Sequence, residues 1–266
     1  EHLILATPDN GVAAAMYAAC KATVKVGDGN EISLHEQTNY PFEETIRFTV
    51  NTPKAVSFPF YLRIPSWTEG ATIFVNGKKV AANPEAGQYA CINREWKDND
   101  QVEIQLPMQL SMRTWQVNKN SVSVDYGPLT MSLKIDEDYV KKDSRATAIG
   151  DSKWQEGADA SQWPTYEIYA KTPWNYALVL GKNEPLKDFK VVHKEWPADN
   201  FPFTVASTPI EVKAIGRKVP SWVIDQYDLC SELPEMDAPK GEKEEITLIP
   251  MGAARLRVSA FPNTRE

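Results

Sequence analysis

The chain offers few side chains that could carry acid–base or nucleophilic chemistry. Its three histidines are His2, His35 and His193, whereas a nucleophilic triad needs a serine or cysteine beside a histidine and an orienting acid. The Gly-x-Ser-x-Gly motif, which would expose a hydrolase serine, does not occur. His35 falls on the outer face of an alternating segment, and His193 lies in a charged stretch. We therefore expect these histidines to be exposed polar residues rather than catalytic ones.

Carboxylates are the second candidate group, because most glycosidases use two of them across a cleft. They cluster at residues 43–44, 98–100 and 242–245. Each cluster lies beside turn or loop residues, so solvated turns explain all three better than catalytic acids do. The sequence identifies no catalytic residue among them.

The cysteines do not indicate a metal site. Cys20, Cys91 and Cys230 are widely spaced and odd in number, so they form neither a disulfide framework nor a Cys-x-x-Cys pair. We expect free, buried thiols that pack as small apolar groups, and no metal site in this chain.

Aromatic side chains remain as candidates for binding, because their rings can stack on the apolar faces of sugars. Trp67 and Trp96 adjoin expected strands and are best explained by packing. Trp154, Trp163 and Trp174 surround a long polar loop at 136–164. We expect them at an exposed surface that contacts either carbohydrate or another domain, since an aromatic patch can mark either kind of site.

The elements that position these residues are strands. From Phe58 to Leu106 the apolar residues alternate in short runs separated by turns, a pattern typical of antiparallel sheets. Asn76 and Gly77 lie between two such runs and predict a two-residue hairpin turn with both residues at positive φ. The fold class expected for the chain is all-β. Residues 136–164 alternate poorly and predict a long loop, with room for a short helix.

A set of motifs in a fixed order carries a family resemblance. LRIPSW at 62–67, VNGK at 75–78 and REWKDNDQVEIQLPM at 94–108 are joined by DYGPLTMSLKI at 125–135 and ITLIPMGAARLRVSAFP at 246–262. With TNYPFEETIRFTV at 38–50, this order resembles the C-terminal half of glycoside hydrolase family 127, the β-L-arabinofuranosidase family that was formerly a domain of unknown function.

The resemblance implies an arrangement of two antiparallel, jelly-roll-like β-sandwich domains, one inserted in the other. Residues 1–20 would join residues 118–266 in a discontinuous domain, and residues 21–117 would form the inserted domain. Residues 11–19 would then be extended and would pair with strands of the C-terminal half, although their alanines alone do not favour a strand.

The resemblance also implies where the catalysis lies. The family uses a cysteine nucleophile and a zinc held by cysteines and a glutamate, in an (α/α)₆ barrel that precedes the matched region. None of these roles falls on a residue of this chain, and zinc is expected only in the missing barrel. The expected function is therefore a non-catalytic part that supports the barrel. The alternatives are a carbohydrate-binding module with its own sugar affinity, an interaction or oligomerisation module, and a complete small hydrolase.

Composition and charge limit the classes of partner that the chain is expected to bind. The net charge is −7 without a long basic run, which disfavours nucleic acid, and no apolar run approaches the length of a membrane span. An apolar fraction of 42% can supply a real core. The expected partners are the barrel and, in second place, carbohydrate. Residues 1–20 contain no recognisable signal peptide. The sequence is compatible with a periplasmic or secreted parent protein and does not assign a compartment.

Overall fold

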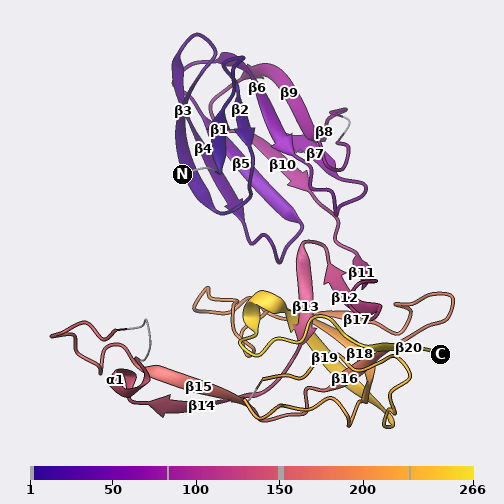
Figure 1. The fold of residues 1–266 in the computed structure, drawn as a ribbon. Coiled ribbons are helices and arrows are strands. Elements are labelled where there is room, and N and C mark those ends of the chain that lie inside the picture. The colour runs from indigo at the N-terminus through magenta and orange to yellow at the C-terminus, as the bar shows by residue number, and fades with distance from the viewer. Residues whose placement is uncertain (1–2, 83, 149–152, 228) are drawn as a thin grey trace. The chain divides into compact units, whose positions relative to one another are not determined.

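The computed structural model describes residues 3–82, 84–148, 153–227 and 229–266, and its architecture is all-β, as the alternation predicted. The chain divides into two compact units (Figure 1). The first unit comprises Glu1–Leu110 and Tyr126–Leu129, and the second comprises Ser111–Asp125 and Thr130–Glu266. The boundary at Leu110 lies before the one expected from the polar residues 118–120.

The first unit consists of a four-stranded and a six-stranded sheet that share one core. The four-stranded sheet has the order β1 (Ile4–Ala6), β2 (Val12–Ala14), β6 (Val56–Arg63) and β9 (Tyr89–Trp96). The six-stranded sheet has the order β3 (Cys20–Val26), β4 (Asn30–Thr38), β5 (Thr45–Asn51), β10 (Asp100–Gln105), β7 (Thr72–Val75) and β8 (Lys78–Lys79). The alternation seen in the sequence places every second side chain of these strands between the sheets.

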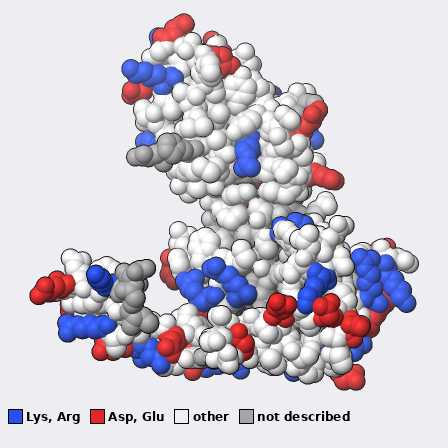
Figure 2. Space-filling model, in the orientation of Figure 1, with Lys and Arg blue, Asp and Glu red and all other residues white. Residues whose placement is uncertain are grey.

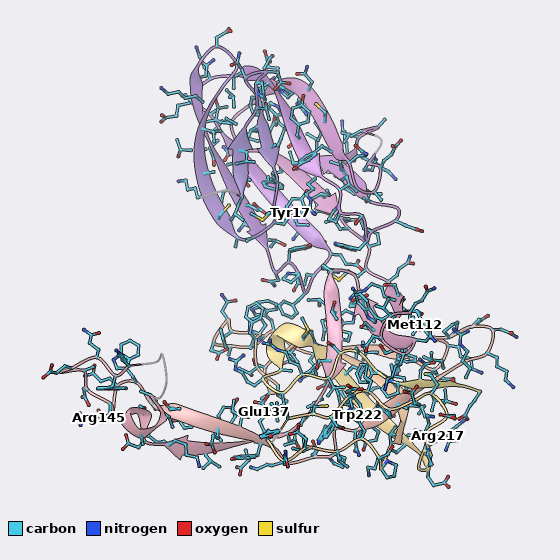
Figure 3. The ribbon with its side chains drawn as sticks, in the orientation of Figure 1. Tyr17, Met112, Glu137, Arg145, Arg217 and Trp222 are labelled. Carbon is cyan, nitrogen blue, oxygen red and sulfur yellow. The ribbon has the colours of Figure 1, made fainter. Side chains whose placement is uncertain are left out.

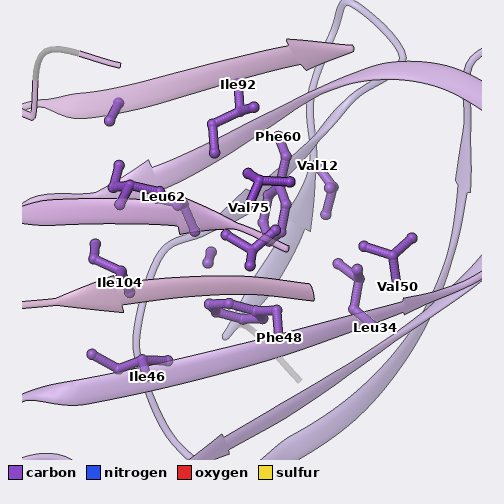
Figure 4. Close-up of a cluster of buried hydrophobic side chains, with 14 of the residues drawn as sticks. Val12, Leu34, Ile46, Phe48, Val50, Phe60, Leu62, Val75, Ile92 and Ile104 are labelled. Atoms are coloured by element: carbon purple, nitrogen blue, oxygen red, sulfur yellow. The ribbon is translucent and has the colours of Figure 1, made fainter. Parts of the chain in front are cut away.

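The core of the first unit is built from large side chains of both sheets (Figure 4). Phe48 of β5 meets Phe60 of β6 edge to face with their ring centroids 5.3 Å apart, and both side chains are fully buried. Trp96 of β9 lies against Phe60 at 6.0 Å and donates from Nε1 to the carbonyl oxygen of Phe58 at 3.0 Å. This hydrogen bond satisfies the polar atom that the indole carries into the core.

The hairpin turn predicted between β7 and β8 is confirmed. Asn76 has φ of 50° and Gly77 has φ of 75°, and Val75 pairs with Lys78 directly across the turn. The Asn76 side chain reinforces it, because Nδ2 donates to Asp100 Oδ1 at 2.7 Å and Oδ1 accepts from the Gln101 backbone N–H at 2.9 Å.

The pairing predicted for residues 11–19 is wrong. Residues 12–14 are extended as expected, but β2 runs parallel to β6, with Val12 opposite Phe60, and antiparallel to β1. All three residues of β2 are buried, and Val12 and Ala14 enter the core of the first unit. The discontinuous domain of 1–20 with 118–266 depended on pairing with the C-terminal half, and the observed partner places β1 and β2 in the first unit instead.

The second unit contains one large sheet. Its strand order is β11 (Leu110–Trp115), β12 (Ser121–Tyr126), β13 (Leu129–Leu133), β19 (Lys243–Pro250), β18 (Ile210–Lys218), β16 (Tyr176–Leu180) and β20 (Asn263–Arg265), with β17 (Lys190–His193) also paired to β18. Phe261 bridges to Val122 of β12, and β20 pairs in parallel with β16. The C-terminal segment thus connects an early strand of the sheet to a late one.

A two-stranded ribbon extends from this sheet (Figure 1). It consists of β14 (Glu137–Lys142) and β15 (Thr165–Ala170), with the short helix α1 (Ser144–Thr147) between them. A 3₁₀ turn, η1 (Met251–Ala253), follows β19. The prediction of a loop over 136–164 therefore missed β14, because a strand of this ribbon has no buried face to impose an apolar alternation. No helix among the described residues has the length and apolar character that a membrane span requires.

Candidate functional site

The three tryptophans singled out by the sequence are not brought together in one cluster. Trp163 precedes β15 and is 68% exposed, Trp154 is half-buried in the segment before it, and Trp174 is half-buried beyond the other end of β15. A six-residue strand spans about 20 Å, so Trp163 and Trp174 lie at opposite ends of the ribbon. Figure 3 labels Arg145 of α1 at the outer end and Glu137 where the ribbon leaves the main sheet.

Trp174 forms the wall of a groove at the base of the ribbon. Its ring meets the buried Trp222 edge to face, with the ring centroids 5.1 Å apart, and Trp222 Nε1 donates to the Ser231 carbonyl oxygen at 3.1 Å. The groove has a volume of about 710 Å³, which is in the range of ligand pockets. Its lining is mostly apolar, with Lys171 and Arg257 as the charged members. Trp222, which fixes the orientation of Trp174, was not among the predicted site residues.

Both faces of the ribbon combine exposed aromatic and charged side chains. Tyr139 lies opposite Ile168 in the register, and the Tyr139 and Tyr166 rings meet edge to face at 6.1 Å; both tyrosines are almost half exposed. The other face carries the exposed Tyr169 together with an ion pair, in which Lys142 Nζ lies 2.9 Å from Glu167 Oε2. A two-stranded ribbon with an uncovered aromatic face is marginal in water by itself.

Exposed apolar side chains are distributed unevenly between the units. Among the described residues, those of large size in the first unit are Leu5, Met16 and Tyr89. Those in the second unit belong to the ribbon and the segment before β15, to β11 and the turn after it, to residues 223–227 and 229, and to residues 201–203 and η1. They comprise Trp115, Val117, Tyr139, Val140, Trp163, Tyr166, Tyr169, Phe201, Phe203, Val223, Ile224, Tyr227, Leu229 and Met251. Apolar patches of this kind mark interaction surfaces or ligand sites.

The described histidines lie at the surface, and two carboxylates of the predicted clusters hold backbone turns. His35 and His193 are exposed, as expected, and His2 lies outside the described residues. Glu44 Oε1 accepts from the Met108 backbone N–H at 2.7 Å. Asp100 is buried rather than solvated, and it accepts from Asn76 Nδ2 and from the Lys97 backbone N–H at 2.9 Å. These carboxylates fix turns in the first unit.

One buried carboxylate was missed by the sequence analysis. Glu36 is 1% exposed; its Oε1 accepts from the Ala18 backbone N–H at 3.0 Å, and its Oε2 lies 3.6 Å from Cys20 Sγ. Burial raises the pKa of Glu36 to about 7, against the smaller opposing effects of these two hydrogen bonds. The signal was present in the sequence, because Glu36 continues the inward series of Ile32 and Leu34.

The cysteines are free, but they are not all buried as expected. Cys20 is half-buried, whereas Cys91 and Cys230 are exposed. Within the described ranges, no group of three or more His, Cys, Asp or Glu side chains is placed to hold a metal ion. The described residues therefore do not fit the zinc–thiolate centre that the resemblance implies for the barrel.

A protein-family model matches most of the first unit. Residues 11–108 match the model of the family described as "Beta-L-arabinofuranosidase, GH127 middle domain". This range covers nearly all of the first unit, from β2 to the end of β10. No curated protein matches the chain.

Comparison with solved structures covers both units. A GH127 β-L-arabinofuranosidase from Geobacillus stearothermophilus T6 matches 99% of this chain with a TM-score of 0.62 and 21% identity. A glycoside hydrolase matches 97% with a TM-score of 0.61 and 22% identity, and a GH127 β-arabinofuranosidase matches 97% with a TM-score of 0.60 and 20% identity. The chain spans only 35–36% of the length of these proteins. The match to the middle-domain family and the shared fold confirm the resemblance of this chain to the β-sandwich region of GH127 proteins.

Proposed function

We propose that the chain is the non-catalytic β-sandwich part of a GH127-type glycoside hydrolase, which packs against and supports an (α/α)₆ catalytic barrel contributed by the rest of the parent protein. The concentration of exposed apolar side chains in the second unit carries this proposal. The parent would hydrolyse β-L-arabinofuranosides, and the cysteine nucleophile with its zinc would belong to the barrel. The described residues of this chain offer no comparable centre.

The energetics favour a covered surface. Fully burying one large apolar side chain is worth roughly 1.5–3 kcal/mol. Most of those exposed in the second unit are already about half-buried, so an interface would need to cover several of them together to offset the cost of association. The ribbon gains most, since its aromatic face would receive the packing layer that a two-stranded sheet lacks.

The test is reconstitution of the parent from two pieces. This chain is mixed with a separately produced barrel, and hydrolysis of an aryl β-L-arabinofuranoside is measured together with co-elution in size-exclusion chromatography. We expect the chain alone to be inactive and the mixture to co-elute and to keep its activity to a higher temperature than the barrel alone. Turnover by the purified chain alone that is abolished by Cys20→Ala or Glu44→Ala would overturn the proposal.

Matched tyrosine variants test the surface. Tyr166→Ser removes an exposed ring from the ribbon, and Tyr89→Ser removes a similarly exposed ring from the first unit; these side chains are 46% and 50% exposed. We expect Tyr166→Ser to weaken co-elution with the barrel and Tyr89→Ser to leave it unchanged. Equal effects would contradict the assignment of the interface to the second unit.

A second candidate function is carbohydrate binding by the chain itself, and the groove beside Trp174 is the observation that favours it. Titration of the isolated chain with arabinose-containing oligosaccharides, monitored by tryptophan fluorescence, separates this candidate from a purely supporting role. A saturable signal that Trp174→Ala removes would establish it.

A further inference from the structure

Three lysines of the second unit converge on one buried carboxylate. Glu211 of β18 is 7% exposed, and its Oε1 lies 3.0 Å from Lys134 Nζ and 3.4 Å from Lys194 Nζ. Its Oε2 lies 3.6 Å from Lys213 Nζ. The lysines come from three places in the chain, namely the end of β13, the end of β17 and β18 itself. We call these four residues the Glu211 cluster.

The cluster carries two surplus positive charges. Within the part of the chain that the structure describes, Glu211 is the sole carboxylate that forms an ion pair with any of the three ammonium groups. Burial acts to raise the pKa of Glu211, but the hydrogen bond and charge of Lys134 and the charges of Lys194 and Lys213 outweigh it and lower the pKa. Glu211 is therefore anionic at neutral pH and neutralises one of the three lysines.

The ammonium groups retain unused hydrogen-bond donors. Each lysine has three N–H donors and no acceptor. Among the residues that the structure describes, Lys134 Nζ donates only to Glu211. Lys194 Nζ donates to Glu211 and the Ala206 carbonyl oxygen, and Lys213 Nζ donates to Thr247 Oγ1 at 2.7 Å. The lysine side chains are only 31–35% exposed, so partly desolvated positive charge lies beside Glu211 with fewer described protein acceptors than N–H donors.

We propose that the Glu211 cluster binds the carboxylate of an acidic sugar, in addition to the supporting role of the chain. A second carboxylate beside Glu211 would accept from the free N–H donors and balance the surplus charge, and hydrogen bonds between charged partners are the strong ones. The partial exposure of the lysines suits an acid group carried by a larger, solvated molecule such as a uronic-acid oligosaccharide. On the face shown in Figure 2, basic and acidic side chains are interspersed over the second unit, so the attraction is local rather than that of a broad basic surface.

The choice of lysine fits this ligand. An ammonium group acts as a compact point charge, whereas arginine selects the planar, two-pronged geometry of one bound group. Three lysines can therefore bind a carboxylate in several orientations, as a flexible glycan chain requires. That the carboxylate belongs to a sugar follows from the proposed function of the chain. That the cluster binds a carboxylate or similar anion follows from the geometry of the cluster alone.

The test is calorimetric titration of the intact chain with tri-galacturonate at low and at physiological salt. The fully methyl-esterified trisaccharide has the same sugar without the charge, and inorganic sulfate and phosphate have the charge without the sugar. We expect saturable binding of tri-galacturonate that weakens as salt screens the lysines, and no binding of the ester. Equal binding of acid and ester, or no binding at low salt, would overturn the proposal. Binding of sulfate or phosphate without binding of tri-galacturonate would contradict the proposal that the ligand is an acidic sugar. It would not affect the proposed supporting role of the chain.

Variants separate a ligand site from a structural ion cluster. Lys134→Met and Lys194→Met keep the length of the side chain and should each weaken tri-galacturonate binding by about threefold or more. Lys182→Met changes the net charge equally at an exposed position of the same unit and should have no effect. Glu211→Gln should tighten binding because it removes the competing carboxylate. Equal binding of tri-galacturonate by Lys134→Met and Lys182→Met would contradict the proposal, and so would weaker binding by Glu211→Gln. Circular dichroism verifies that each variant is folded.

Discussion

The two units of this chain differ in how completely they bury their apolar side chains. In the first unit, buried residues of eight strands form one continuous core, and Phe48, Phe60 and Trp96 have no exposed surface. The second unit also buries apolar side chains completely, among them Leu178, Leu248 and Phe261, and smaller clusters form around Trp222 and Ile249. Most of the large exposed apolar side chains of the described chain nevertheless lie on its surface. Both units are made mainly of strands, so the exposed apolar side chains distinguish the surface of the second unit from that of the first.

The difference indicates that stability and interaction are divided between the units. The first unit satisfies its own hydrophobic residues, as a domain with an independent core does. The second unit leaves a larger set of apolar side chains exposed, and such surface is characteristic of interaction sites. Substitutions in the first unit should therefore cost folding free energy, whereas substitutions on the exposed surface of the second unit should cost binding.

The largest effect is expected from the core of the first unit. Phe60→Ala removes a fully buried ring that touches Phe48 and Trp96, and such truncations cost about 3–5 kcal/mol. Trp163→Ala removes a larger but exposed ring from the second unit and should change the free energy of unfolding by less than about 0.5 kcal/mol. Urea titrations followed by circular dichroism measure both. Similar losses in the two variants would break the comparison.

The next effect is the dependence of the first unit on pH through Glu36. The pKa of Glu36 is about 7 in the folded chain, against 4.5 for an ordinary glutamate. Because the folded-state pKa is raised, the protonated form is the favoured one. Its stabilising contribution is fully present below pH 4.5 and is lost as the pH rises through 7.

Glu36→Gln should remove this dependence. The variant should become more stable than the wild-type chain by about 2 kcal/mol at pH 8, after allowance for solvent around the carboxylate, with little difference at pH 4. Glu31→Gln on the exposed face of the same strand is the matched control. Urea titrations at several pH values give the comparison, and parallel pH profiles for wild type and Glu36→Gln would show that Glu36 is not held as the structure indicates.

A smaller effect is expected at the Asn76–Gly77 turn. Gly77 has φ of 75° and open space where a Cβ would lie, so Gly77→Val adds backbone strain without a steric clash. The cost should be about 1 kcal/mol. Gly241→Val, at a glycine without positive φ and with ordinary contacts, is the control for the loss of glycine flexibility. An unchanged melting temperature of Gly77→Val would contradict the strained geometry.

The sequence predicted the parts of the fold in which a residue pattern is compatible with a single local structure. The alternation of Phe58, Phe60 and Leu62 requires one buried face, and Asn76-Gly77 supplies the two residues that tolerate positive φ. The pairing of β2 could not be predicted, because a three-residue strand of small, buried side chains could pair with the edge strand of either unit's sheets. β14 was missed because the sequence EDYVKK at 137–142 has no apolar face and acquires its strand conformation only from pairing with β15.

The candidate site was less predictable than the fold. A tryptophan in a polar segment indicates that the ring has a role, but not which other ring it meets. Trp174 depends on Trp222, which is distant in sequence and brought near by β16 and β18. The Glu211 cluster likewise joins lysines from separate strand ends, and no local pattern links them. Such contacts follow from sheet order, which periodicity does not determine.

The smallest effect on stability, and the most direct test of the division between units, is expected from Tyr166→Ser. The Tyr139–Tyr166 contact lies at the surface of the ribbon, and an exposed aromatic pair contributes about 0.5 kcal/mol. Global unfolding should therefore barely change, because the main sheet does not depend on the ribbon. Hydrogen exchange should instead accelerate for the amides that pair β14 with β15, since the ribbon opens locally when its ring contact is lost. Accelerated exchange throughout the second unit would show that the ribbon is part of its core, and the uncovered aromatic face would then no longer indicate a surface prepared for another domain.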